Sequence, residues 1–196
     1  MKAPSIIVAG GTNLDIKSRI AGKTVPGTSN PGRTETSPGG VGRNIAENLA
    51  RLGADTKLLT VIGEDATGDR LRRAARAAGI DTSLMLQRKG ATGTYNVTLD
   101  ANGQMLIGVS DMELIDAMKP AGINARKEAL AAADLLVVRP PFDPPRQPGH
   151  PVSVIDLRAI FQQGHRSLRL QDLPPVLLPL HAHADLADFF GRILLP

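Results

Sequence analysis

Apolar and polar positions alternate along the first 138 residues with two different periods. Ser5–Ala9 is a continuous apolar run that stops at two glycines, which predicts a buried strand. From Gly42 to Leu52 the apolar residues recur every three or four positions, and the pattern ends at Gly53, which predicts a helix. Strands that alternate with helices predict a doubly wound α/β sheet. The other predicted elements are a strand at 56–62, a helix from an Asp65 cap to Ala78, a helix at 125–133 and a strand at 135–138.

A second group of strands is short and polar. Thr94–Leu99 and Gln104–Val109 flank Asp100-Ala-Asn-Gly103, and this arrangement predicts a β-hairpin. Three further strands are predicted at 17–21, 24–28 and 33–37. Because these three strands are short and polar, we expect them to form a small sheet apart from the main one.

The composition changes abruptly after Val138. Residues 1–138 hold 5 of the 15 prolines and 17 of the 20 glycines, whereas residues 139–196 hold 10 prolines and all 4 histidines. Proline blocks helix interiors and central strands, so we expect residues 139–196 to form an irregular tail. Within the tail, a strand at 152–155 and a terminal helix are weaker predictions. The apolar face of that helix would comprise Leu186, Phe189, Phe190, Ile193 and Leu194.

Composition and charge exclude several classes of function. The chain has no cysteine, which excludes disulfides, thiolate catalysis and zinc–thiolate sites. Aromatic residues make up only 3%, too few to stack on single-stranded nucleic acid, and the net charge is only +4. No run approaches the ~18 apolar residues of a membrane span, so we expect no membrane partner and a cytoplasmic location. The basic cluster at Arg70, Arg72, Arg73 and Arg76 is interpreted as a solvated helix face rather than a nucleic-acid site.

Two glycine-rich turns carry the candidate chemistry. In the first, Gly39 and Gly40 let the backbone approach a ligand, and Asn44 lies in the first turn of the helix that follows. The second turn, Gly10–Asp15, directly follows the first strand, at the end of the sheet where open α/β sheets bind ligands. The carboxylate of Asp15 suits two vicinal hydroxyls. A tight turn before a helix is the alternative for the glycines, and a turn or cap role is the alternative for Asp15.

Other motifs are weaker. A P-loop needs glycine directly before Lys-Ser, but Ile16 precedes Lys17-Ser18, and Gly10–Asn13 does not supply the Gly-x-Gly-x-x-Gly of a dinucleotide-binding turn. His181, His183 and Asp185 would share a face on a strand, yet the segment is proline-rich, so we expect no metal site there.

The ordered set of motifs resembles the PfkB (ribokinase-like) carbohydrate kinases. The segment Gly39-Gly-Val-Gly-Arg-Asn-Ile-Ala46, followed by Gly53 and Gly63, is similar to a family signature, and pseudouridine kinases are the members most similar to it. The resemblance covers residues 5 to about 138 and implies a ribokinase-like sheet with a β lid, its strands at about 14–37 and 93–109. It implies that Asp15, Gly39, Gly40 and Asn44 hold ribose hydroxyls and that Asn13 supports their loop. Thr94 and Tyr95 would lie near the sugar or base, with simple packing as the alternative for Tyr95; Asp111 would contact substrate or cap a helix.

The resemblance also implies a reaction, the ATP- and magnesium-dependent phosphorylation of a ribosyl 5′-hydroxyl, with pseudouridine favoured. The family takes its catalytic base from a late Gly-Ala-Gly-Asp motif, and residues 139–196 contain no Gly-x-Gly-Asp. We therefore expect no catalytic residue in this chain, a truncated fold, and a tail that arose by frameshift near codon 139. The alternatives are a non-catalytic nucleoside-binding or interaction module and a misfolding-prone relic. A homodimer through the lid strands or an exposed sheet edge is a further expectation.

Overall fold

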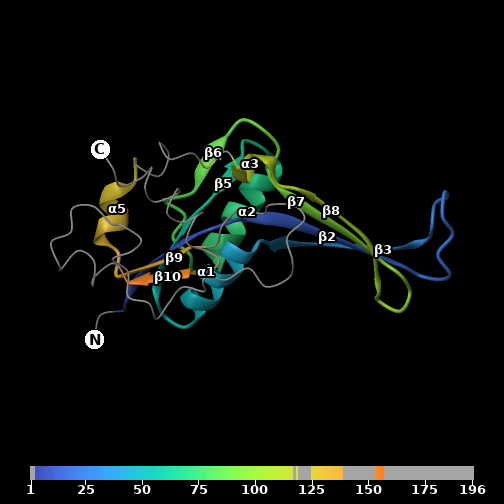
Figure 1. Cartoon of the computed structure of the whole chain (residues 1–196), viewed down its shortest axis with the longest axis horizontal. Helices are drawn as coiled ribbons and strands as arrows, with labels where there is room; N and C mark the ends of the chain where they lie inside the picture. The colour runs from blue at the N-terminus through green and yellow to red at the C-terminus, as the bar shows by residue number, and fades with distance from the viewer. Residues whose placement is uncertain (1–2, 117, 119–124, 139–152, 157–196) are drawn as a thin grey trace.

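The computed structural model describes residues 3–116, 118, 125–138 and 153–156. Figure 1 shows a body built around one sheet, and an arm of long strands that extends away from it. The body sheet has the strand order β10-β9-β1-β4, and the arm, called the lid sheet below, has the order β3-β2-β7-β8. These layers confirm the predicted α/β class and the separate small sheet.

The body sheet is centred on the first strand. Strand β1 (Ser5–Ala9) pairs in parallel with β4 (Asp55–Leu59) on one side and with β9 (Leu135–Val138) on the other. Strand β10 (Ser153–Asp156) adds to β9 in the antiparallel direction, so the body sheet continues past Val138. Because later strands join β1 on opposite sides, the order of the sheet reverses at β1. In open α/β sheets, ligands bind outside the carboxyl end of such a strand.

The core of the body lies between this sheet and two helices. Ile6 and Val8 of β1 pack with Leu58 of β4, and helix α1 (Val41–Arg51) and helix α2 (Ala66–Ala77) each add a buried alanine to the same cluster. Ile7, which lies between Ile6 and Val8 and points to the other face of β1, is also fully buried. Both faces of β1 are therefore covered, as is usual for parallel strands. The two predicted helices are confirmed. Asp65 caps α2 by accepting from the N–H of Gly68 at 2.6 Å.

The prediction of one strand at 56–62 is wrong. Strand β4 ends at Leu59, and β5 (Val61–Gly63) belongs to a separate two-stranded sheet with β6 (Leu86–Arg88). The carbonyl of Thr60 already accepts from the N–H of Leu86, so the chain changes ladders at this residue. The sequence does not reveal the break at Thr60, because both strands are buried and their apolar residues read as one run.

The lid sheet consists of two antiparallel hairpins. The first joins β2 (Asn13–Ile20) to β3 (Gly32–Gly39), the second joins β7 (Thr94–Leu99) to β8 (Met105–Asp111), and β2 pairs with β7 in parallel. The hairpin around Asp100–Gly103 is therefore confirmed. The predicted strand at 24–28 is wrong, because this segment forms the loop of the first hairpin. There the side chain of Asn30 bonds both the N–H and the carbonyl of Val25, in place of a strand partner.

Three further outcomes concern the end of the chain. Helix α3 (Glu113–Asp116) follows β8, and helix α5 (Lys127–Ala132) leads into β9 as predicted. The weakly predicted strand at 152–155 is found one residue later, as β10. The predicted terminal helix and the candidate metal ligands His181, His183 and Asp185 lie outside the described residues, as does most of the proline-rich tail. Within the described ranges, no helix is long and apolar enough to cross a membrane.

Candidate functional site

The lid joins the body at the carboxyl end of β1, where two glycine-rich segments pack against each other. These segments, residues 10–12 and 39–42, together with 92–93, are called the neck below. A Cβ on Gly42 would lie 2.6 Å from the carbonyl carbon of Gly10, and the N–H of Arg43 donates to the carbonyl of Gly11 at 3.2 Å. Only glycine at position 42 lets the start of α1 lie this close to the turn after β1.

The same packing requires glycine at positions 40 and 39. Gly40 precedes α1 with a φ of 95°, and a Cβ there would lie 2.5 Å from the carbonyl oxygen of Gly11. A Cβ on Gly39 would lie 2.2 Å from Oδ2 of Asp15. The carboxylate of Asp15 therefore lies directly against the backbone of Gly39. Close packing in a tight turn before a helix is thus one reason for these glycines. Ligand contact by Gly39 and Gly40 remains a prediction.

Asp15 is held by the residue two positions before it. The side chain of Asn13 is buried, and its Nδ2 donates to Oδ1 of Asp15 at 2.6 Å. Asp15 itself is half-buried. A carboxylate offers about four acceptor positions, and Asn13 fills one of them. The remaining positions give the carboxylate the capacity to accept from hydroxyl groups.

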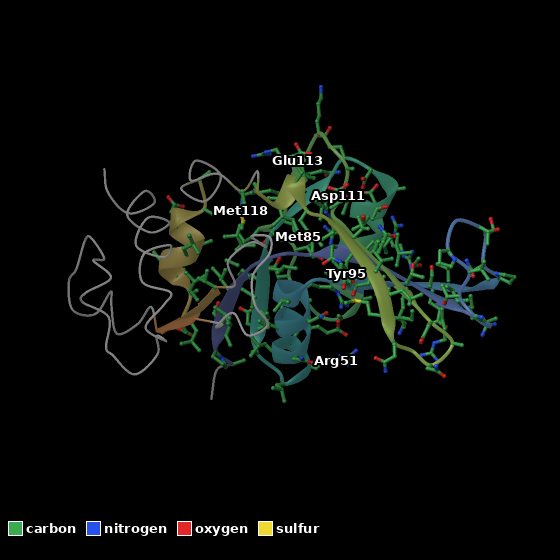
Figure 2. All side chains as sticks on the ribbon, turned by 45° about the vertical axis from the view of Figure 1, so that its right-hand side comes forward. Arg51, Met85, Tyr95, Asp111, Glu113 and Met118 are labelled. Atoms are coloured by element: carbon green, nitrogen blue, oxygen red, sulfur yellow. The ribbon has the colours of Figure 1, made fainter. Side chains whose placement is uncertain are left out.

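The strand register separates the two predicted lid residues. Tyr95 is registered opposite Asp15, and Thr94 is opposite Leu14. Successive side chains of a strand point to opposite faces, so Tyr95 shares the face of Asp15 and Thr94 lies on the other face. The Tyr95 ring lies over Gly108, with its hydroxyl 3.7 Å from Sδ of Met105. Figure 2 shows Tyr95 on the lid strands, and a ring in this position covers the same face as the carboxylate.

Asn44 lies in the first turn of α1, on the other side of the glycine pair. Its N–H donates to the carbonyl of Gly40 at 2.9 Å, and its side chain is exposed. Asp15 and Asn44 thus each contact one of the two neck glycines, whereas Tyr95 shares a sheet face with Asp15 farther along the lid. Thr94 is the predicted residue that the structure places on the opposite face.

Comparison with known proteins identifies the family of this chain. The family model described as "pfkB family carbohydrate kinase" matches residues 3–152, most of the chain. The chain belongs to the pfkB family. The pseudouridine kinase of Escherichia coli is 32% identical over 133 residues, which are 67% of this chain and 42% of that protein.

Solved structures show the same fold. A carbohydrate kinase from Agrobacterium tumefaciens has a TM-score of 0.64 and 34% identity, over 69% of this chain and 45% of that one. The ribokinase of Arabidopsis thaliana, solved in complex with ribose and ATP, has a TM-score of 0.51 and 27% identity, over 56% and 36% of the two chains. This pfkB chain therefore spans less than half the length of each of these three proteins.

One functional candidate in this pfkB chain was not predicted from its sequence. Arg43 is buried, and its guanidinium bonds the side chain of Asn44 at 3.2 Å and the carbonyl of Pro38 at 3.3 Å. Glu47, one turn later, forms an ion pair with it. The spacing of Arg43, Glu47 and Arg51 was a visible signal, since residues four apart are neighbours on a helix. A row of charges on a helix is nevertheless typical of a solvated face.

A second network fixes the start of β7. Asp65 accepts from the hydroxyl of Thr92 at 2.6 Å and from the N–H of Thr92 at 2.8 Å, in addition to its cap bond from Gly68. The Thr92 hydroxyl in turn accepts from the N–H of Gly63. Burial by itself raises the pKa of Asp65, but the hydrogen bonds from Thr92 and Gly68 outweigh it, so the pKa lies below 3.8. Thr92 stands two residues before Thr94, so this carboxylate positions the lid strand.

One other sequence-based expectation, the capping of a helix by Asp111, can be compared with the structure. Asp111 lies where β8 reaches α3 (Figure 2), and among the described contacts its carboxylate has no hydrogen-bond partner, so it does not cap α3. In the described ranges, no group of three or more His, Asp or Glu side chains is placed to hold a metal ion.

Proposed function

We propose that this pfkB chain binds the ribosyl part of a nucleoside, with pseudouridine favoured, at the neck face that carries Asp15. The observation that supports the proposal is the Asp15 carboxylate, which lies against Gly39, is oriented by Asn13, and shares its face with Tyr95. A fixed carboxylate accepts hydrogen bonds from vicinal hydroxyls, and an aromatic ring beside it provides an apolar surface for a sugar or base. The pseudouridine kinase and the ribose-bound ribokinase among its relatives support the same class of ligand.

The reaction that this binding would serve is ATP-dependent phosphorylation of the ribosyl 5′-hydroxyl. ATP is implied by the family and by the ATP-bound ribokinase, while a magnesium requirement rests on the family resemblance alone. The described residues hold no cluster of metal ligands, and the sequence has no Gly-x-Gly-Asp turn to supply a base. We therefore assign no described residue to ATP, to magnesium or to the transfer of a phosphoryl group.

Little or no turnover is accordingly expected from the isolated chain. A coupled assay of ADP release, with pseudouridine and MgATP, measures this directly. Nucleoside binding without ADP release would favour the alternative in which the chain acts as a non-catalytic nucleoside-binding module. Robust ADP release would contradict the proposed inactivity.

Binding itself is tested by calorimetric titration with pseudouridine in the absence of ATP. The variant Asp15→Asn keeps the shape of the side chain and removes the charged acceptor, so we expect affinity to fall at least about tenfold. Asp55→Asn is the matched control, since Asp55 is an exposed aspartate at the start of β4. Equal affinity of the wild type and the Asp15→Asn variant would overturn the proposed site.

We also propose that two copies of the chain associate through β8. This strand is the edge of the lid sheet and is exposed at every position, with Met105, Leu106, Ile107 and Val109 each 47–62% exposed. An apolar edge strand with unpaired backbone groups is complementary to a second copy of itself. Sedimentation should show a dimer that Ile107→Lys converts to a monomer. A monomeric wild type at tens of micromolar would contradict this proposal.

A further inference from the structure

Arg43 is a buried cation at the neck for which the proposed binding of sugar gives no direct role. Its relative exposure is 9%, and among the described residues its Nε has no hydrogen-bond partner. Burying a charge is costly unless partners compensate for it. The partners that Arg43 does have are the Glu47 carboxylate, the Pro38 carbonyl and the Asn44 side chain. Two of these three groups belong to the segments that border Gly39 and Gly40.

The contact between Arg43 and Asn44 fixes the direction of an amide. A guanidinium has donors and no acceptor, so the atom of Asn44 that lies 3.2 Å from Nη1 of Arg43 must be the carbonyl oxygen Oδ1. The NH₂ group of Asn44 is then on the far side from Arg43. Without a charged neighbour, the two orientations of an exposed amide would be close in energy.

The same argument fixes the second amide of the site with the opposite result. A carboxylate only accepts, so the atom of Asn13 that lies 2.6 Å from Asp15 must be its NH₂ group. Asn13 therefore uses its donor within the protein, and Asp15 remains an acceptor. Asn44 uses its acceptor within the protein, and its donor remains.

We propose that Arg43 is a positioning residue that makes Asn44 present its NH₂ group, and not its carbonyl, to the ligand. The site then offers an acceptor at Asp15 and a donor at Asn44, and it is complementary to a vicinal diol of which one hydroxyl donates to Asp15 and the other accepts from Asn44. Glu47 holds the guanidinium in place, and Arg51 pairs with the other oxygen of Glu47 at 2.5 Å. This inference rests on the proposed sugar binding, which it deepens by assigning the hydrogen-bond polarity of the site.

The contact itself is tested without any ligand. In ¹H–¹⁵N spectra of the full chain, the side-chain amide resonances of Asn44 should move in Arg43→Met. They should stay in place in Arg73→Met, because Arg73 is exposed and lies on another helix, α2. Unchanged Asn44 resonances in Arg43→Met would overturn the inference.

The role is tested by the affinity for pseudouridine. We expect Arg43→Met and Asn44→Ala each to weaken binding about tenfold, and the double variant to be no weaker than either, because both remove one oriented donor. Arg43→Lys should recover part of the loss, and Arg73→Met, at an exposed site of α2, should bind as the wild type does. Losses that multiply in the double variant would show a general structural role and overturn the inference.

A third variant serves if Arg43→Met does not fold. Asn44→Asp pairs with Arg43 and suits the first turn of a helix, so it should fold, yet it presents only acceptors and should bind at least about tenfold more weakly. Wild-type affinity in Asn44→Asp would overturn the inference. Absence of heat with the wild type would instead overturn the proposed function, and the amide resonances of Asn44 would then decide alone whether Arg43 orients the side chain.

Discussion

The body and the lid of this molecule are stabilised in different ways. In the central strand of the body, β1, every residue but the first is buried, whereas every residue of the lid strand β8 is exposed. The body has an apolar core between sheet and helices, and the lid is held by backbone pairing and by its contacts at the neck. The candidate binding groups lie where the two parts meet. The candidate ligand-binding groups of the lid therefore lie on a sheet whose position depends on the neck more than on an apolar core of its own.

The largest effect should come from truncating the core of the body. Leu58 is fully buried in the shared cluster, so Leu58→Ala should lower the free energy of unfolding by about 2–5 kcal/mol. The lid counterpart, Val109→Thr, changes a side chain that is 54% exposed and should stay within about 0.5 kcal/mol. Urea titrations of both variants, at a concentration where the chain is monomeric, measure the difference. Equal losses would show that the lid has a core of its own.

A smaller loss is expected at the neck. Gly42→Ala places a methyl group against the Gly10 backbone, and overpacking of this kind costs about 1–3 kcal/mol, although alanine is the better helix former. The control is Gly22→Ala, because a Cβ at Gly22 meets nothing within 4 Å. Thermal unfolding of the two variants makes the comparison. A Gly42→Ala variant as stable as Gly22→Ala would show that the neck is loosely packed.

The carboxylate that links α2 to the start of β7 should give a pH-dependent effect. The pKa of Asp65 is lowered on folding, so its contribution is fully present above 3.8 and is lost as the pH falls through the folded pKa. Asp65→Asn should therefore cost about 1 kcal/mol at pH 7 and should reduce the acid sensitivity of the chain below pH 4. Asp69→Asn, an exposed site on the same helix, is the control for urea titrations across this range. An acid limb that is the same in all three proteins would contradict the assignment.

The smallest effect is expected where helix α2 contacts the lid strand β3. Arg70 donates to the hydroxyl of Thr36 at 3.0 Å and to its carbonyl at 3.3 Å, and both contacts are exposed. Thr36→Val removes only the first bond and should change the free energy of unfolding by less than about 0.5 kcal/mol. A loss above about 1 kcal/mol in a urea titration would show that this contact, rather than the neck, holds the lid to the body.

Local patterns predicted what depends on neighbouring residues. The period of apolar residues found α1 and α2, and the turn at Asp100–Gly103 found the second hairpin. One of the two strand errors arose where a distant partner decides, since β5 leaves the ladder of β4 to pair with β6. The predicted strand at 24–28 failed because an asparagine side chain took the place of a strand partner.

The candidate site also contains some residues that the sequence could suggest and others that it could not. The glycine-rich turns, with Asp15 and Asn44 beside them, could be chosen as candidates from the sequence because their residue types and spacing suit a ligand site. The burial of Arg43 could not be predicted, because a row of charges such as Arg43, Glu47 and Arg51 is typical of a solvated helix face. The link from Asp65 to Thr92 crosses 27 positions and leaves no local pattern either.

Hydrogen–deuterium exchange of the full chain, with and without saturating pseudouridine, tests the location of binding most directly. Backbone amides are protected where a ligand rigidifies the chain. The account predicts protection in the segments 10–15, 37–44 and 94–96, with the body strands β4 and β9 unchanged. Protection confined to the body, or none at the neck when heat of binding is measured, would contradict the claim that the neck face holds the sugar.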